Sequence, residues 1–272
     1  MAERMKRSDL RALLVDAGKA LLLREGLVCG LDRVTFPRVF DIVESQTGRR
    51  ITRASVYDRI WRSQAEFQWE VLAELLQDRG GVADATREIV ADVLANADRT
   101  SETGRWDCLS ELCLIAVERH VHELSEMQVQ RIALAAIGAV ASSPADPTTE
   151  PFVVRVQDTL HRYLLRETDS FLDLYLTIGS FLGFRLRDPL ELRHLVLAIG
   201  ALAEGTALRM TFFPEYGAAI AVPASDDAQL AGRWTLASVG VIALARHMLE
   251  IDPDWYPERE VHLPQNGPPS ST

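Results

Sequence analysis

The chain opens with two segments whose apolar residues follow helical spacing. Ser8 can cap the first helix, in which apolar residues recur every three or four positions until Gly26 ends it. Thr35 can cap the second helix, because Pro37 is tolerated in a first turn and Gly48 is a natural stop. These signals predict one helix between Ser8 and Gly26 and another between Thr35 and Gly48.

Two further helices follow at short intervals. Thr52 can cap a short third helix with the sequence RASVYDRIW, residues 53–61. Ser63 and Glu66 have the spacing of a capping box, in which the two side chains satisfy backbone N–H groups at the start of a helix. An apolar stripe follows them. Four helices within about 75 residues, the third of them short, are typical of a helix-turn-helix unit.

The rest of the sequence predicts longer helices and no strand, so we expect an all-α protein. Asp188 and Pro189 have the pattern of a cap and a first helical residue. We divide the chain into a helix-turn-helix domain (1–80), a larger helical regulatory and dimerisation domain (81–251) and an extended, proline-rich tail (252–272). The expected later helices cover 83–97, 104–122, 125–141, 150–166, 169–184, 189–211 and 226–250.

Charge is distributed unevenly along the chain. The formal net charge is −10, which by itself argues against a nucleic-acid partner. Residues 1–62, however, contain 13 Lys and Arg against 8 Asp and Glu, whereas residues 63–272 contain 16 against 31. Because acidic surface repels phosphate, this asymmetry indicates that only the N-terminal part faces DNA.

Two stretches of the first 75 residues resemble a known family. VDAGKALLLREGL is an amphipathic helix that ends at glycine. ITRASVYDRIWRSQAEFQWEVLAEL contains a turn, a small residue, a Val-Tyr pair, an aromatic residue and a capped helix, in that order. Together they resemble the TetR family of bacterial transcriptional regulators over roughly residues 7–75. The resemblance implies a homodimer that binds a palindromic operator, with repression the expected mode and activation the alternative, and a small-molecule effector bound in the C-terminal domain.

The short third helix is expected to enter the major groove of double-stranded DNA, where base edges carry a sequence code. Arg53 suits the acceptors of guanine, Ala54 allows a close approach of the backbone, and Tyr57 either donates to a phosphate or packs in the core. The expected DNA-binding residues are Thr35, Arg49, Arg50, Thr52, Arg53, Ala54, Ser55, Tyr57, Arg59, Ser63 and Gln64.

Two departures from the family pattern motivate an alternative function. Gln64 stands where the family usually has a phosphate-binding lysine, and the turn QTGRRIT is longer than usual by roughly two or three residues. Arg49 and Arg50 within that turn can replace the missing phosphate contact. The alternative is a helical interaction protein with a degenerate helix-turn-helix unit and no sequence-specific DNA binding.

The C-terminal helices suggest a ligand site and a dimer interface. Phe171, Tyr175, Ile178 and Phe181 lie nearly on one helical face, which is core in most proteins but lines a ligand cavity if the family resemblance holds. The helices expected at 189–211 and 226–250 are long, apolar and rich in small residues. Two such helices from each subunit can form a four-helix bundle about a two-fold axis, so we expect the homodimer interface there.

Other chemistry has little support in the sequence. No phosphate-binding glycine loop, nucleophile elbow or Ser-His-Asp arrangement is visible, so we expect no catalytic residue and no cofactor, and an all-helical enzyme is the weakest alternative. His120 and His122 are two apart and Cys108 and Cys113 five apart, which are poor spacings for metal ligands. With Cys29 these cysteines form a sparse, odd set that is typical of reduced thiols. No signal peptide and no membrane-spanning run is visible, so we expect a cytoplasmic protein.

Overall fold

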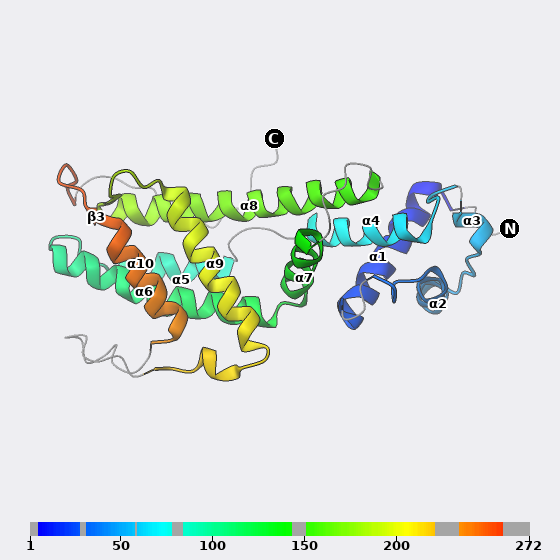
Figure 1. Cartoon of the computed structure of the whole chain (residues 1–272), viewed down its shortest axis with the longest axis horizontal. Coiled ribbons are helices and arrows are strands. Elements are labelled where there is room, and N and C mark those ends of the chain that lie inside the picture. Colours follow the sequence, from blue (N-terminus) through cyan, green and yellow to red (C-terminus); the bar gives the residue numbers. More distant parts are fainter. Residues whose placement is uncertain are drawn as a thin grey trace. The chain divides into compact units, whose positions relative to one another are not determined.

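The computed structural model describes residues 5–27, 31–57, 59–77, 84–142, 151–220 and 234–257. The described chain is predominantly helical, which confirms the expected all-α class (Figure 1). Contacts divide it into two compact units. The first unit comprises Met1–Gly80 with Gln128–Leu165, and the second comprises Gly81–Met127 with Arg166–Thr272.

The first unit is built on the four N-terminal helices, which begin close to the positions expected from sequence, although Ser8 lies inside the first helix instead of capping it, and Lys6 holds the N-cap position. Gly26 and Gly48 follow the first and second helices, and Gly48 adopts a left-handed conformation with φ of 67°. A Cβ atom on Gly18 would lie 2.6 Å from Val71 Cγ2, so glycine is what allows the first and fourth helices to pack closely. The helices are α1 (Arg7–Glu25), α2 (Phe36–Thr47), α3 (Arg53–Val56) and α4 (Gln64–Gln77).

The third helix is shorter than the expected segment 53–61 and stops at Val56. Tyr57 is extended, with ψ of 139°, and its ring packs edge-on against Phe36 at 5.1 Å between centroids. Trp61 is only 1 % exposed, and its indole N–H donates to Glu70 at 2.8 Å. The chain leaves the helical path because both aromatic side chains are packed against the core of this unit.

The first unit also includes residues that the sequence analysis assigned to the C-terminal domain. α7 (Gln128–Ser142) and the first part of α8 (Pro151–Leu182) share one hydrophobic core with α1 to α4. Ile132 and Leu160 are buried in that core, and the Tyr163 hydroxyl donates to Gln130 at 2.5 Å. The expected domain boundary at residue 80 places residues 128–165 in the C-terminal domain, whereas their contacts in the structure place them in the first unit.

The second unit contains the other helices and a small antiparallel ribbon that the sequence analysis missed. The ribbon pairs Phe184 with Ile251, Arg185 with Glu250 and Leu186 with Leu249. Three-residue strands are too short to show an alternating pattern, which explains why none was expected. The elements are α5 (Asp84–Ala95), α6 (Glu102–Glu126), the rest of α8, β2 (Phe184–Leu186), α9 (Leu192–Met210), η1 (Pro214–Gly217), α10 (Leu236–Met248) and β3 (Leu249–Ile251).

Several expected helix boundaries in this part of the chain are wrong. α8 is one continuous helix, not the two expected at 150–166 and 169–184, because no glycine or proline interrupts residues 152–178. Pro189 lies in a turn instead of opening α9, which begins at Leu192 after the Glu191 N–H donates to the His194 ring at 2.9 Å. α10 begins at Leu236 behind a Thr235 cap, and residues 226–233 of that expected helix lie outside the described residues.

The start of the expected tail is packed onto the second unit. The Asp252 N–H donates to the Gly183 carbonyl at 3.0 Å, and the Trp255 indole donates to the Ser180 carbonyl at 2.9 Å. A Cβ atom on Gly183 would lie 2.3 Å from the Trp255 ring, so the ring occupies the space of a side chain. An extended tail from residue 252 is therefore wrong for residues 252–257, and residues 258–272 lie outside the described residues.

Candidate nucleic-acid interface and apolar cavity

Two glutamines of α4 fix the start of α2. The Gln64 side-chain oxygen accepts the Phe36 N–H at 3.4 Å. The buried Gln68 amide donates to the carbonyl oxygens of Leu31 and Val34, at 2.8 and 3.1 Å. Gln64, where the family pattern has lysine, therefore orients α2 through its oxygen. Since a side-chain amide has two further donors, Gln64 can still donate to a phosphate.

The start of α4 shows one half of the expected capping box, and the Glu66 carboxylate bonds one residue earlier than expected. The Ser63 hydroxyl oxygen accepts the Glu66 N–H at 3.1 Å, and the Glu66 carboxylate accepts the Arg62 N–H at 2.8 Å. Ser63 is thus committed to the helix end. Thr35 occupies the N-cap position of α2, as expected, but its side chain makes no capping hydrogen bond.

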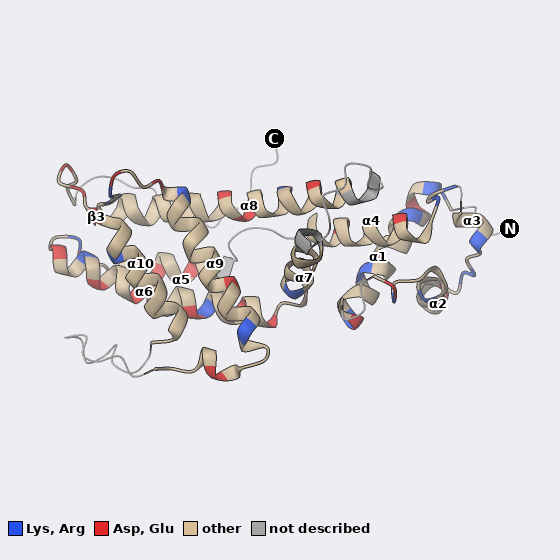
Figure 2. Cartoon of the chain, viewed as in Figure 1, with Lys and Arg blue, Asp and Glu red and all other residues tan. Residues whose placement is uncertain are grey.

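Arginines from three segments surround one surface hollow of about 690 Å³ in the first unit. Arg49, Arg50 and Arg59 were expected from sequence to bind DNA, and Ser55 lies at the same hollow. Arg7, from the first turn of α1, was missed because its proximity depends on the packing of α1 beside the α2–α3 turn. Within the described residues, none of these four arginines forms an ion pair. Figure 2 shows basic residues near α3 and the start of α1.

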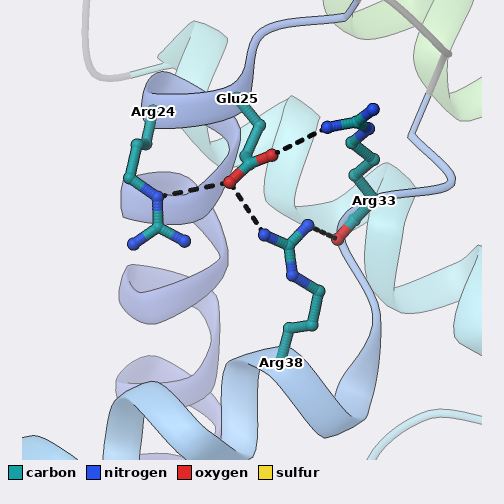
Figure 3. Close-up of polar contacts among 4 residues, drawn as sticks. All are labelled: Arg24, Glu25, Arg33 and Arg38. Carbon is teal, nitrogen blue, oxygen red and sulfur yellow. Dashed lines mark hydrogen bonds and ion pairs between the residues drawn. The ribbon is translucent and has the colours of Figure 1, made fainter.

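Other arginines of the same unit are neutralised in an ion cluster. Glu25 accepts from Arg38 at 2.7 Å, from Arg33 at 3.3 Å and from Arg24 at 3.3 Å (Figure 3). The hydrogen bond from Arg38, followed by that from Arg33, lowers the pKa of Glu25 below its usual value. Arg38 also donates to the Arg33 carbonyl at 3.1 Å, which ties α2 to the turn before it. This cluster joins α1 to α2, and much of its positive charge is compensated locally.

α3 presents the expected base-reading residues to solvent. Thr52, Arg53 and Ala54 are exposed, and the Arg53 guanidinium lies 5.9 Å from the centre of the Tyr57 ring. Ser55, in contrast, is engaged locally, because its hydroxyl donates to the Thr52 carbonyl at 2.6 Å and accepts the Thr52 N–H at 3.3 Å. Of these two side chains, Arg53 is therefore free to contact a bound partner, whereas the Ser55 hydroxyl is occupied within α3.

The second unit encloses an apolar cavity of about 320 Å³. Phe171, Tyr175 and Ile178, three of the four residues expected to line a ligand site, line it. Phe181 is not among its lining residues, and its ring lies 4.1 Å from the Arg99 guanidinium. The sequence pattern found the correct helical face, but could not separate the residue that packs under an arginine from those that border the cavity.

Burial favours the uncharged forms of three ionisable side chains in the cavity wall, His120, Cys113 and Tyr175. Desolvation lowers the pKa of His120 and raises the pKa of the Cys113 thiol to about 12. It also raises the pKa of Tyr175 well above its usual value. Cys113 and Cys108 are free and buried, as expected for reduced thiols, whereas Cys29 lies outside the described residues.

α9 and α10 carry exposed apolar residues and small residues. Leu197, Leu208 and Leu236 are 52, 45 and 46 % exposed. A Cβ atom on Gly200 or Gly205 would meet no described atom within 4 Å outside its own helix turn. Other small residues serve the subunit itself: Ala203 and Ala237 are buried, and a Cβ atom on Gly240 would lie 2.6 Å from Leu202. Only part of the small-residue pattern is therefore available to a second subunit.

Comparisons with protein-family models, curated proteins and solved structures returned no match. Across the described part of the chain, no three or more His, Cys, Asp or Glu side chains are grouped to hold a metal ion. None of the helices described combines the length and apolar character needed to cross a bilayer. The candidate sites therefore depend on the geometry of the two units alone.

Proposed function

We propose that this chain is a homodimeric, TetR-like transcriptional regulator that binds DNA through its N-terminal helix-turn-helix unit. The arginine hollow carries the proposal: Arg7, Arg49, Arg50 and Arg59 surround one surface without ion-pair partners among the described residues. Phosphate binding by exposed arginines releases counterions and dominates the affinity of proteins for DNA. Unpaired arginines beside an exposed short helix therefore support a DNA-facing surface.

Within this proposal the named residues have separate roles. Arg53, exposed on α3, reads guanine in the major groove, and Ala54 lets the backbone approach. Arg49 and Arg50 contact phosphates in place of the family's lysine. The Tyr57 hydroxyl has no hydrogen-bond partner among the described residues, so it can donate to a phosphate while its ring packs on Phe36. Thr35, whose side chain makes no capping bond, can do the same.

The proposed homodimer uses the exposed faces of α9 and α10. A two-fold interface requires one surface patch to complement itself, and small residues allow the closest approach. On α9, the exposed side chains of Leu197 and Leu208 lie on either side of Gly205, whose missing side chain leaves room for close approach. On α10, Leu236 adds a further exposed apolar side chain. Two subunits joined in this way would present two α3 helices to a palindromic site.

The direct test is binding of the full-length protein to DNA from upstream of its own gene, measured by fluorescence anisotropy against a scrambled duplex of equal length. We expect dimeric binding that is at least about 1,000-fold tighter on the specific sequence, the lower end for specific DNA-binding proteins. Arg53→Ala should reduce that ratio, whereas Arg49→Ala should weaken binding to both duplexes equally. Equal affinity of the wild-type protein for both duplexes would refute the proposal.

A second candidate follows from the length of α3. Four residues make barely one helical turn, so fewer side chains can face a groove than in the expected nine-residue helix. This observation favours a helical interaction protein that retains the N-terminal unit without reading a sequence. Weak, salt-sensitive binding to both duplexes alike is the result that would favour this candidate in the same experiment.

A further inference from the structure

One polar atom in the wall of the apolar cavity has no hydrogen-bond partner among the described residues. Thr86, on α5, is only 3 % exposed and lines the cavity, and its hydroxyl makes no hydrogen bond within the described structure. A buried hydroxyl without a partner costs about 1–3 kcal/mol, so native proteins rarely retain one without compensation. A group bound in the cavity is a direct source of that missing hydrogen bond.

The rest of the wall offers no partner for a buried charge. His120, Cys113 and Tyr175 are neutral at pH 7 for the reasons given above, and the side chains around them are mainly apolar. The charged side chain among the lining residues is Arg185, and it already contacts Glu250 at 2.7 Å. An ion inside the cavity would lose its hydration without gaining a counter-charge, which is strongly unfavourable.

The exposed lining residues indicate where the cavity opens. Leu176 is 60 % exposed, and the Arg185 side chain is 52 % exposed. Both lie where α8 and the β2–β3 ribbon reach the surface, and Arg185 pairs there with Glu250, with Asp188 and Asp252 close enough to add negative charge. An uncharged molecule is neither attracted nor repelled by these charges, whereas an anion meets an excess of carboxylates at this edge.

We propose that this cavity binds an uncharged, largely apolar small molecule with one polar group, such as a ketone, ester or alcohol, that hydrogen-bonds to the Thr86 hydroxyl. Its volume of about 320 Å³ is at the lower end of the range for ligand sites, roughly 300–1,000 Å³, so the molecule is small. The assignment gives a chemical class to the effector, and its regulatory meaning rests on the proposed function. Binding itself does not require DNA.

The test is isothermal titration of the full-length protein, without DNA, using three probes of similar length: decan-2-one, decanoate and decylammonium. We expect the ketone to bind at least about tenfold more tightly than either ion, the equivalent of one unpaired polar interaction. Equal or tighter binding of decanoate or decylammonium would overturn the uncharged class. Absence of binding by all three would overturn the cavity as a site for molecules of this kind.

Thr86→Val is the matched variant, because it keeps the shape of the side chain and replaces the hydroxyl with a methyl group that cannot hydrogen-bond. Ketone affinity should fall about three- to tenfold, the range for one hydrogen bond, while thermal stability is unchanged or higher. Unchanged affinity would remove Thr86 from the site. Ala116→Leu should fill the cavity and abolish binding, and Leu112→Phe serves the same purpose if the first variant does not fold. Binding retained by a folded filling variant would place the ligand elsewhere.

The two proposals can fail separately. Ketone binding by a protein that shows no preference for any DNA would overturn the proposed function and leave the cavity assignment intact. Specific DNA binding by a protein that takes up none of the probes would do the reverse. If decan-2-one changes the affinity of the wild-type protein for DNA and does not do so in Thr86→Val, the ligand in the cavity regulates DNA binding.

Discussion

The salt dependence of DNA binding gives the sharpest prediction, because it counts phosphate contacts. Each contact adds about −0.9 to the slope of log affinity against log salt for duplex DNA. If Arg49 binds a phosphate in each subunit of a dimer, Arg49→Ala removes two contacts and makes the slope shallower by about 1.8. A monomer on DNA would lose only about 0.9.

Fluorescence anisotropy titrations at several salt concentrations between 50 and 200 mM would measure this slope. Over that fourfold range, two contacts account for about a 12-fold change in affinity. The ratio of wild-type affinity to Arg49→Ala affinity should therefore fall by about 12-fold from the lowest to the highest salt, on specific and scrambled duplexes alike. Arg49 is exposed, so its replacement should change folding stability by no more than about 0.5 kcal/mol.

Arg24→Ala is the matched control in the same unit. Arg24 is also an exposed arginine, but it already pairs with Glu25 at 3.3 Å (Figure 3). Its removal should leave the slope unchanged. An unchanged slope in Arg49→Ala, or an equal change in both variants, would refute the division of the arginines into phosphate-binding and structural groups.

Three further predictions concern the second unit. Gly205→Arg should convert a dimer to a folded monomer in size-exclusion chromatography with light scattering, because its Cβ meets open space within the subunit. Gly183→Ala should destabilise the protein to thermal unfolding by about 1–3 kcal/mol beyond backbone strain, because its Cβ would overlap Trp255. Asp98→Asn should reduce stability to urea at pH 5 but not near pH 2. Hydrogen bonds from Thr100 lower the pKa of Asp98 from 3.8 to about 2, so its contribution is present above 3.8 and is lost as the pH falls through 2.

Each of these predictions has a control or a contrary outcome. Gly138→Arg adds the same side chain to open space on α7 and should leave the oligomeric state unchanged. Gly48 has the same positive φ as Gly183 but open surroundings, so Gly48→Ala should cost only the backbone strain, about 1–2 kcal/mol. Equal losses in the two alanine variants would contradict the role given to Trp255. A constant effect of Asp98→Asn from pH 5 to pH 2 would contradict the role given to its carboxylate.

Local signals in the sequence were sufficient for much of the first unit. Gly26, Gly48 and the Ser63 cap mark helix ends through interactions within a few residues, and the structure confirms all three, although the Glu66 carboxylate accepts from Arg62 and not from Ser63. The end of α3 could not be read in this way. It depends on Tyr57 packing against Phe36, some 20 residues earlier in the sequence, and such tertiary contacts override local propensity.

The cavity shows the same limit. Helical periodicity placed Phe171, Tyr175 and Ile178 on one face, but whether that face meets a neighbouring helix or a space depends on the packing of α5, α6, α9 and α10. Thr86 gave no signal at all, because a threonine in a helix is ordinary until its hydroxyl is found buried and without a hydrogen-bond partner in the described part of the chain. The β2–β3 ribbon was missed for a related reason, since its short strands are defined only by pairing across more than 60 residues of sequence.

For the charged residues, the structure adds information that the sequence does not contain. The sequence gives a basic excess to residues 1–62 but treats every arginine there as equal. The structure separates them, since three surround Glu25 whereas Arg7, Arg49, Arg50 and Arg59 border one hollow without ion pairs among the described residues. An arginine that already pairs with a carboxylate neutralises less phosphate charge, and so releases fewer counterions from DNA, than an unpaired arginine. A nucleic-acid interface in the N-terminal unit is therefore indicated less by the number of its arginines than by which of them have no carboxylate partner among the described residues.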